Sequence, residues 1–417
     1  MYQKKKDKQE GSCFYAVKRS TYPVYERPHK TEGENALYKI EKPTFFSFLI
    51  NHFPQSSLLG ICSKLVQYIY SGHGSSGRAP ALGAGGSRFK SGCPDFFVMN
   101  QTNFYRQNTF LFSHSPADTA EEQHDDGIIT ETTFPFFTPF LFDRLVLSAN
   151  FRANMEGDIL LEVQVCSQGE WSRYYKMGLL SNKFKRSFPE QEDALGKVLV
   201  DELCLSRPAE GYRFRIKFSG RSQLLNLTVS GVRAPFVYDE FYASQLPSGE
   251  CVVRVEPYSQ MELATEEQTR VCSPTSLCMA LNALGYYTTP ELLMPEVFDQ
   301  AASIYGNWMF NVAAAGQLGA DAFVRRFSSL LELEEWVSAS SLVVASIGYQ
   351  KGELDNAPSE KTAGHLVLIR GWRDGKVLVA DPAAPTKETV CRAYDAKQFA
   401  QVWLKNKKGA AYVVKKK

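Results

Sequence analysis

The segment Val271–Leu277, Val-Cys-Ser-Pro-Thr-Ser-Leu, places a cysteine at the predicted start of a helix. Pro274 is pre-set for the first helical turn, apolar residues fill the next two turns, and Gly285 follows as a C-terminal cap. The N-terminus of a helix presents unpaired N–H groups and the positive end of the backbone dipole, and both favour a thiolate. The pattern therefore predicts an activated thiol at Cys272.

A thiolate nucleophile needs a nearby base, and from residue 125 onward the sequence holds a single histidine, His365. Residues 365–371 and 376–380 are strand-like apolar runs joined by an Asp-Gly pair, which is a strong hairpin signal. Asp381 follows the second run, so the hairpin brings it roughly abreast of His365. A carboxylate there can hold the imidazole in the productive tautomer. Cysteine, histidine and acid together predict a nucleophilic site.

Cys272 and His365 also have a non-catalytic interpretation. A cysteine at a helix start is more often a small buried side chain, and a lone histidine is more often structural than catalytic. The hairpin favours the chemical interpretation, because it brings a base and an orienting acid together.

Several ordered motifs resemble the C39-like family of papain-fold cysteine peptidases, over about residues 250–405. They are Cys-Ser-Pro-Thr-Ser at 272–276, Tyr-Gly-Asn-Trp-Met-Phe-Asn at 305–311, Glu-Leu-Glu-Glu-Trp at 332–336, Gly-His-Leu-Val at 364–367 and Ala-Asp-Pro-Ala at 380–383. The resemblance implies a papain-like α+β domain over 250–417. It also implies that Cys272 is the nucleophile, His365 the base and Asp381 the orienting residue.

The family further places a glutamine upstream of the cysteine as an oxyanion donor, usually in a Ser-Gln pair. Ser259-Gln260 matches that pattern, whereas Gln268 is nearer to the cysteine in sequence, so both stay open. In the family the 305–311 loop lies near the cleft. Asn307 or Trp308 is therefore expected to contact substrate, although Trp308 fits a packing role equally well.

The region 99–236 is predicted to be a separate antiparallel β-sandwich domain. Apolar residues alternate with polar ones at 159–165, 212–218 and 225–229, and six strands recur at sandwich-like spacing. Motifs at 147–150, 169–172 and 198–201 resemble the β-sandwich found ahead of some members of the same peptidase family. Trp171 and the neighbouring tyrosines are either sandwich core or the lining of a groove for a sugar or peptide. The predicted fold class is thus multidomain α+β.

Composition narrows the classes of partner and the cellular compartment that we expect. The net charge of +2 gives no argument for a nucleic-acid partner, and no apolar run reaches the roughly 20 residues of a membrane span. Nine cysteines without tight spacing predict neither a disulfide framework nor a zinc site, and no cofactor is expected. No secretory signal is visible at the start, which favours the cytoplasm. Residues 1–98 are predicted to be a poorly ordered extension with a Gly/Ser-rich linker.

The expected reaction is hydrolysis of a peptide or amide bond through an acyl-enzyme on the thiol. Two alternatives remain. An acyltransferase would use the same three residues but pass the acyl group to an amine or thiol. A non-catalytic binding protein could be built on a retired peptidase domain, although the intact residue set favours an enzyme.

Overall fold

The computed structural model describes residues 104–417 apart from 106–108, 115–118, 126–127, 134 and 154–155. All of these residues fall within one compact unit, Phe96–Lys417. The extension predicted over residues 1–98 lies outside the described residues.

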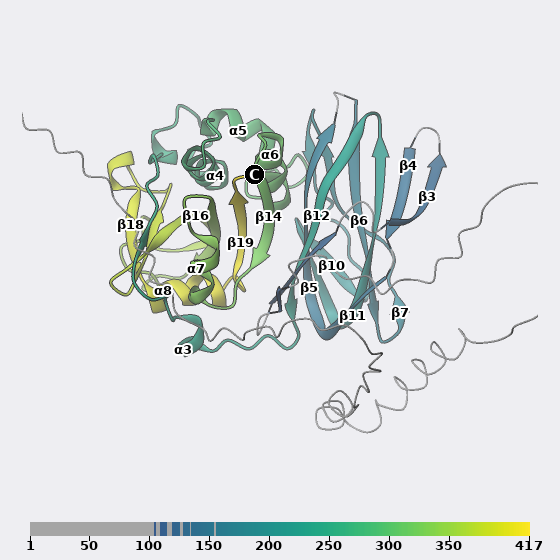
Figure 1. The fold of residues 1–417 in the computed structure, drawn as a ribbon, viewed down its shortest axis with the longest axis horizontal. Coiled ribbons are helices and arrows are strands. Elements are labelled where there is room, and N and C mark those ends of the chain that lie inside the picture. The colour runs from purple at the N-terminus through teal and green to yellow at the C-terminus, as the bar shows by residue number, and fades with distance from the viewer. Residues whose placement is uncertain (1–103, 106–108, 115–118, 126–127, 134, 154–155) are drawn as a thin grey trace, which may run out of the picture. The chain divides into compact units, whose positions relative to one another are not determined.

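The first half of the described chain forms one antiparallel sheet of twelve strands, blue and teal in Figure 1. Its main hydrogen-bonded path runs β1-β2-β12-β5-β11-β6-β8-β9. Off this path, β4 and β10 pair with β11, β3 pairs with β4, and β7 pairs with β6. The strands are β1 Phe104–Tyr105, β2 Thr109–His114, β3 Thr119–Asp125, β4 Ile128–Thr133, β5 Phe136–Ala153, β6 Asp158–Ser167, β7 Glu170–Trp171, β8 Tyr175–Ser181, β9 Lys185–Arg186, β10 Gly196–Leu199, β11 Glu202–Ser219 and β12 Ser222–Arg233.

The alternation of apolar and polar residues in the sequence corresponds to strands of this sheet that have one buried face. Phe214 and Ile216 of β11 are buried in one apolar cluster with Val163 of β6, which confirms the predicted strands. Residues 197–205 form a hairpin instead of one continuous strand. Val200 has a positive φ of 59° and turns the chain between β10 and β11.

The segment His124–Asp126 has the polar composition of an exposed turn. His124 and Asp125 lie in β3, where they pair with Ile129 and Ile128 of β4. Of the three residues, Asp126 lies outside the described positions. The described part of the segment is a strand despite its polar composition. It is joined to the sheet through its neighbour β4.

The second half forms a seven-stranded antiparallel sheet in the order β14-β19-β15-β16-β17-β18, with β13 paired to β16. Its strands are β13 Cys251–Val252, β14 Asp321–Arg326, β15 Ser341–Tyr349, β16 Thr362–Arg373, β17 Lys376–Ala380, β18 Cys391–Asp395 and β19 Ala410–Lys415. The helical segments are α3 Glu240–Ala243, η2 Gln260–Glu262, η3 Gln268–Arg270, α4 Cys272–Ala283, α5 Pro290–Val297, α6 Trp308–Gln317, η4 Leu330–Glu332, α7 Leu333–Trp336, η5 Lys387–Thr389, α8 Ala396–Ala400 and η6 Gln401–Lys405.

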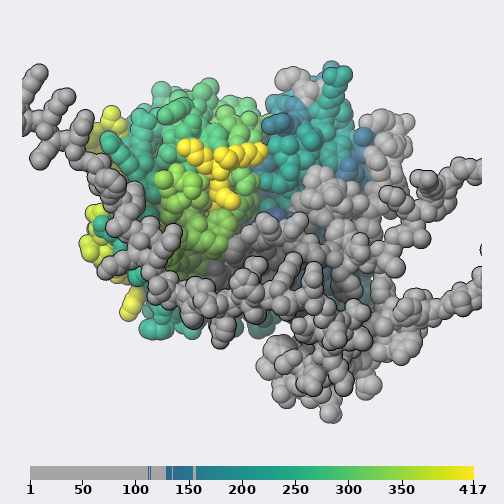
Figure 2. Space-filling view, in the orientation of Figure 1, coloured from purple at the N-terminus to yellow at the C-terminus, as the bar shows by residue number. Residues whose placement is uncertain are grey.

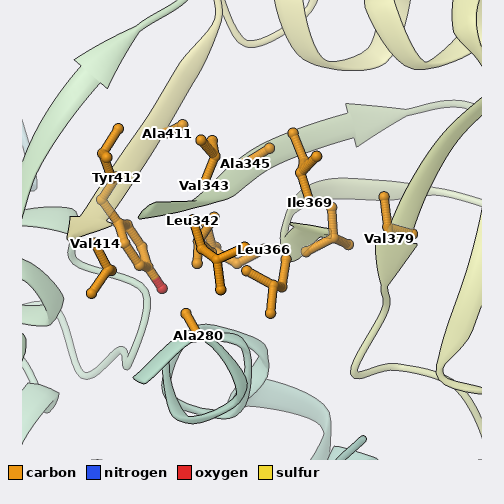
Figure 3. Packing of buried hydrophobic residues seen from close by; sticks show 14 of the residues in the cluster. Ala280, Leu342, Val343, Ala345, Leu366, Ile369, Val379, Ala411, Tyr412 and Val414 are labelled. Carbon is orange, nitrogen blue, oxygen red and sulfur yellow. The ribbon is translucent and has the colours of Figure 1, made fainter. Parts of the chain in front are cut away.

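Helix α4 packs against the face of this second sheet (Figure 3). Ala280 points from the helix toward Leu366 of β16 and the neighbouring apolar side chains. Two buried polar contacts fix the helix at its N-terminal end. The Ser276 hydroxyl donates to the Leu366 carbonyl over 3.0 Å, and the Tyr412 hydroxyl of β19 donates to the Ser273 carbonyl over 3.2 Å.

Polar side chains cap the start of three other helical segments. Thr289 caps α5, which ends at Val297 because Phe298 is extended. Helix α6 begins at Trp308, directly after Asn307, whose side chain caps it. Ser329 and Glu332 form a capping box at the start of η4.

Helix α6 belongs to both halves of the unit. Met309, Phe310 and Ala313 are buried in the apolar cluster of the first sheet, while Val312 is buried in that of the second. Strand β14 is also joined to the first sheet, because the Val324 N–H donates to the Ser148 hydroxyl of β5 over 2.8 Å.

The C-terminal residues lie on the surface, where they form the yellow band in Figure 2. Lys415 ends β19. The Lys416 N–H donates to the Ser340 carbonyl over 2.9 Å. Within the described residues, we find no helix with the length and apolar character needed to cross a membrane.

Candidate active site

Cys272 is the first residue of α4, as the sequence predicts. The residue before it, Val271, has no side-chain acceptor, so it leaves the first N–H groups of the helix uncapped by a side chain. These groups and the helix dipole favour negative charge on the Cys272 sulfur.

The predicted hairpin is present and carries the other two residues. Asp374 and Gly375 turn the chain with φ of 50° and 72°, the left-handed region that Asp-Gly adopts most readily. His365 lies near the start of β16 and Asp381 directly after β17. The His365 Nε2 is 2.7 Å from the Asp381 Oδ1, and both side chains are buried. The other ring nitrogen, Nδ1, is the one left to serve Cys272.

The three groups perturb one another strongly. Burial alone would raise the pKa of the Cys272 thiol, but the hydrogen bond and positive charge of His365 hold that pKa below its ordinary value. Burial opposes the charge on His365, yet Asp381 and then Cys272 raise the imidazole pKa to about 10. Burial opposes the charge on Asp381 as well, and His365 outweighs it, so the carboxyl pKa is lowered. The arrangement therefore favours transfer of the thiol proton to the imidazole.

Asp381 has a further partner that no sequence motif indicates. The buried Tyr394 hydroxyl donates to Asp381 Oδ2 over 2.7 Å, and the Ala383 N–H donates to Oδ1 over 3.0 Å. Burial and the neighbouring carboxylate raise the pKa of Tyr394, so the phenol stays protonated and continues to donate. Tyr394 lies on β18, which the register brings beside β17.

Gln260 lies beside the segment that follows Asp381. Its backbone N–H donates to the Pro382 carbonyl over 2.8 Å, and its side chain is 4% exposed. The Gln260 Nε2 donates to the Gln268 carbonyl over 2.8 Å, and its Oε1 has no hydrogen-bond partner within the described part of the chain. The Gln268 side chain instead donates to the Leu263 carbonyl over 2.6 Å.

Asn307 and Trp308 have structural contacts. The Asn307 side chain is 1% exposed, accepts the Phe310 N–H, and donates to Asp299 over 2.9 Å. Trp308 is half-buried, and its backbone N–H donates to Asp201 over 2.6 Å. These contacts place both residues in the packing of α6, and contact with substrate stays a prediction.

Among the described residues, no group of three or more histidine, cysteine, aspartate or glutamate side chains is arranged to hold a metal ion.

The comparison with curated proteins finds no match to this chain. Among solved structures, a C39-like peptidase from Bacillus anthracis is 17% identical with a TM-score of 0.32, covering 41% of this chain and 98% of that one. The peptidase domain of Streptococcus ComA, a bifunctional ABC transporter of a quorum-sensing pathway, is 15% identical with a TM-score of 0.28. That alignment covers 40% of this chain and 99% of that one. Residues 252–411 match the model of the Peptidase_C39 like family. The likeness to the Peptidase_C39 like family is thus shown for residues 252–411.

Proposed function

We propose that this chain is a cysteine peptidase that hydrolyses peptide or amide bonds with Cys272 as nucleophile, His365 as base and acid, and Asp381 as the orienting residue. The observation that carries the proposal is the buried His365–Asp381 pair, 2.7 Å apart, beside a thiol whose pKa is lowered. The match of residues 252–411 to the peptidase family model supports the reaction class. A papain-like arrangement of α4 on the second sheet fits this chemistry.

The reaction proceeds in two balanced steps. The Cys272 thiolate attacks the substrate carbonyl carbon, and a C–S bond forms. The amide C–N bond breaks as His365 gives its proton to the leaving nitrogen. Water then attacks the thioester carbonyl and loses a proton to His365, and the C–S bond breaks to release the acid and restore the thiolate. Asp381 holds the imidazole throughout.

Gln260 is the better candidate for the oxyanion donor, because its backbone N–H donates to the Pro382 carbonyl, directly after Asp381. A carboxamide carries two N–H donors, and the Gln260 Nε2 uses one of them on the Gln268 carbonyl, which leaves the second for a substrate oxygen. Gln268 has its amide turned back to Leu263. Removal of one oxyanion donor typically lowers the rate on the order of 100-fold.

Three finer points belong to the same proposal. An acyltransferase would use the same residues. Adding amines or thiols and searching for conjugates distinguishes it from a hydrolase.

The first sheet is interpreted as a β-sandwich that folds over on itself, since β12 and β6 contact one another although two strands separate them in the sheet. Six free thiols among the described cysteines support a reducing compartment such as the cytoplasm.

The test is thiol labelling, which needs no known substrate. Limiting iodoacetamide at about pH 6 should label Cys272 ahead of the exposed Cys391, because an ordinary thiol with a pKa near 8.5 reacts slowly there. His365→Ala should abolish the preference, since it removes the cation that holds the Cys272 pKa down. Labelling of Cys391 in preference to Cys272 would contradict the proposal.

A further inference from the structure

The outward face of the first sheet carries a row of cations on one strand. On β11, Phe214 and Ile216 point into the core, so Arg213, Arg215 and Lys217 lie on the opposite face. Residues two apart on a strand stand roughly 7 Å apart. The row therefore presents three positive charges at a regular spacing.

Neighbouring strands extend the positive charge. The register sets Lys176 of β8 opposite Glu162 of β6, and Arg186 of β9 opposite Leu179 of β8. Both of these basic side chains are exposed. The carboxylates on the same face of these strands are Asp158 and Glu162 of β6, so the cations outnumber them. Glu162 is 2% exposed and paired with both Arg215 and Lys217, so one buried carboxylate faces these two cations.

The two guanidinium groups lie over aromatic rings. The Arg213 Cζ lies 4.7 Å from the centre of the Trp171 ring, and the Arg215 Cζ lies 4.1 Å from that of Tyr174. The hydrogen bonds that anchor them use Nε, on Gln164 for Arg213 and on Glu162 for Arg215. Their terminal NH2 groups are thereby oriented as paired donors of the kind that bind a carboxylate.

An aromatic pair stands at the end of the cation row. Phe137 of β5 is 63% exposed, and its ring centre lies 6.1 Å from that of Trp171. Gly211 makes room for the ring, because a Cβ at that position would lie 2.8 Å from the Phe137 Cδ1. A large exposed aromatic pair of this kind is typical of a surface that a ligand covers.

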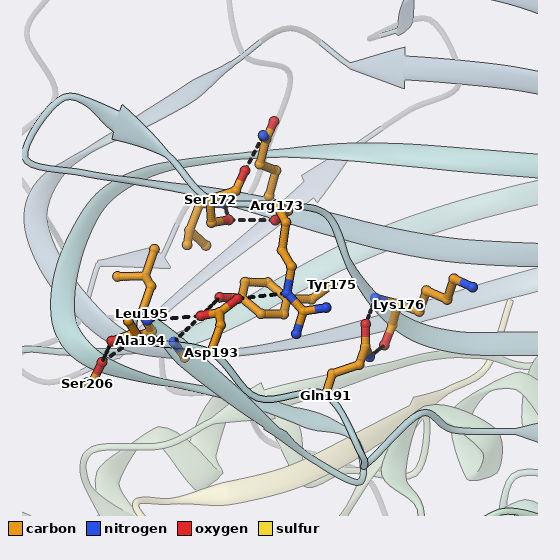
Figure 4. A network of polar contacts seen from close by, with 12 residues as sticks. Ser172, Arg173, Tyr175, Lys176, Gln191, Asp193, Ala194, Leu195 and Ser206 are labelled. Atoms are coloured by element: carbon orange, nitrogen blue, oxygen red, sulfur yellow. Dashed lines mark hydrogen bonds and ion pairs between the residues drawn. The ribbon is translucent and has the colours of Figure 1, made fainter.

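The segment that carries Trp171 and Tyr174 is anchored on both sides of them. Figure 4 shows Asp193 accepting from the Tyr175 hydroxyl and the Arg173 Nε, each over 2.7 Å. Burial opposes the charge of Asp193, but these donors outweigh it and lower the carboxyl pKa to about 2, so the anchor stays ionised at neutral pH. The platform is thus formed before any ligand arrives, which reduces the entropic cost of binding.

We propose that this face binds an extended acidic peptide. Same-side residues of an extended chain repeat at roughly 7 Å, which is the spacing of the cations on β11. Glutamate or aspartate at every second position would meet the cation row, and an aromatic residue at one end would stack on the exposed pair. The acidic-peptide face is defined by Phe137, Trp171, Tyr174, Arg213, Arg215 and Lys217.

The experiment measures binding by fluorescence anisotropy to the full chain carrying Cys272→Ala, so the result does not depend on catalysis. The probe is a labelled peptide with one terminal phenylalanine and glutamate at alternate positions. We expect saturable binding that weakens at least tenfold as salt rises toward about 1 M, where the Debye length is near 3 Å. A lysine version of the peptide should not bind.

Matched variants locate the site. Arg213→Gln with Lys217→Gln keeps the Arg215–Glu162 pair and should weaken binding about tenfold, and Phe137→Ala should weaken it several-fold. Lys376→Gln, on the second sheet, and Leu141→Ala, on the same strand as Phe137, should leave it unchanged. Equal binding by all variants would overturn the proposal. So would preferential binding of single-stranded DNA or an anionic glycan over the peptide.

Discussion

Tyr394 influences the charge of the candidate site indirectly, through its hydrogen bond to Asp381. Its hydroxyl helps to keep the Asp381 carboxyl ionised, and Asp381 in turn is the largest favourable influence on the His365 cation. Tyr394→Phe would leave Asp381 Oδ2 buried without its donor, so the Asp381 pKa rises. Asp381 then stabilises the His365 cation less well, so the pKa of His365 falls and the pKa of Cys272 rises.

The expected result is a shift of the alkylation profile of Cys272 toward higher pH, with the rate at pH 6 reduced about tenfold or more, since a hydrogen bond to a charged group contributes about 1.5–3 kcal/mol. Tyr349→Phe is the control, because Tyr349 is also buried but bonds to Ser359 instead of Asp381. Identical profiles for the two variants would exclude a positioning role for Tyr394.

The helix start predicts Cys272 and the Asp-Gly hairpin places His365 beside Asp381, because both are local signals. The grouping of Cys272 with this pair follows from the resemblance to the peptidase family. Tyr394 could not be predicted in the same way. Its approach to Asp381 depends on how β18 pairs with β17, which no local pattern in the segment 391–395 determines.

At the scale of the element, the motif at 305–311 contains a residue, Asn307, whose contacts stabilise the start of α6. Asn307 closes the start of α6 and also donates to the buried Asp299. Its burial depends on long-range contacts, since Asp299 also accepts the Ser187 N–H over 3.0 Å from a loop next to the first sheet. The sequence predicts a polar residue in a loop there, and it contains no signal for this second partner.

Asn307→Ala should therefore lower stability without affecting substrate affinity. Loss of a cap costs about 1 kcal/mol, and the unpaired Asp299 adds to that cost. Thr289→Ala, which removes the cap of α5, should cost less because its partner is exposed. Urea denaturation measures both. A KM raised by Asn307→Ala with unchanged stability would instead favour the predicted contact with substrate.

At the scale of the whole unit, the two sheets share α6 and so are not independent. The prediction of separate domains at 99–236 and 250–417 follows from a change of pattern along the chain, from alternating strands to mixed elements. Such a pattern does not reveal that Met309, Phe310 and Ala313 complete the apolar core of the first sheet. We therefore infer that the second half would expose these side chains if it were produced alone.

Gly316 tests this shared packing with a single residue. Alanine in place of glycine inside a helix normally stabilises by about 1 kcal/mol. In α6 the added Cβ would overlap the Asn150 side chain of β5, which itself donates to the Ala322 carbonyl of β14 over 2.7 Å. We therefore expect Gly316→Ala to destabilise the whole unit in urea denaturation.

Asn150→Ala alone should also destabilise, because it removes that hydrogen bond. The double variant should be less destabilised than the sum of the two single changes, since the shorter side chain relieves the overlap. The circular dichroism signal of the unit should be lost in one transition, because α6 is packed into both cores. Additive effects, or separate transitions for the two sheets, would mean that they fold independently and that α6 is only a surface contact of the first.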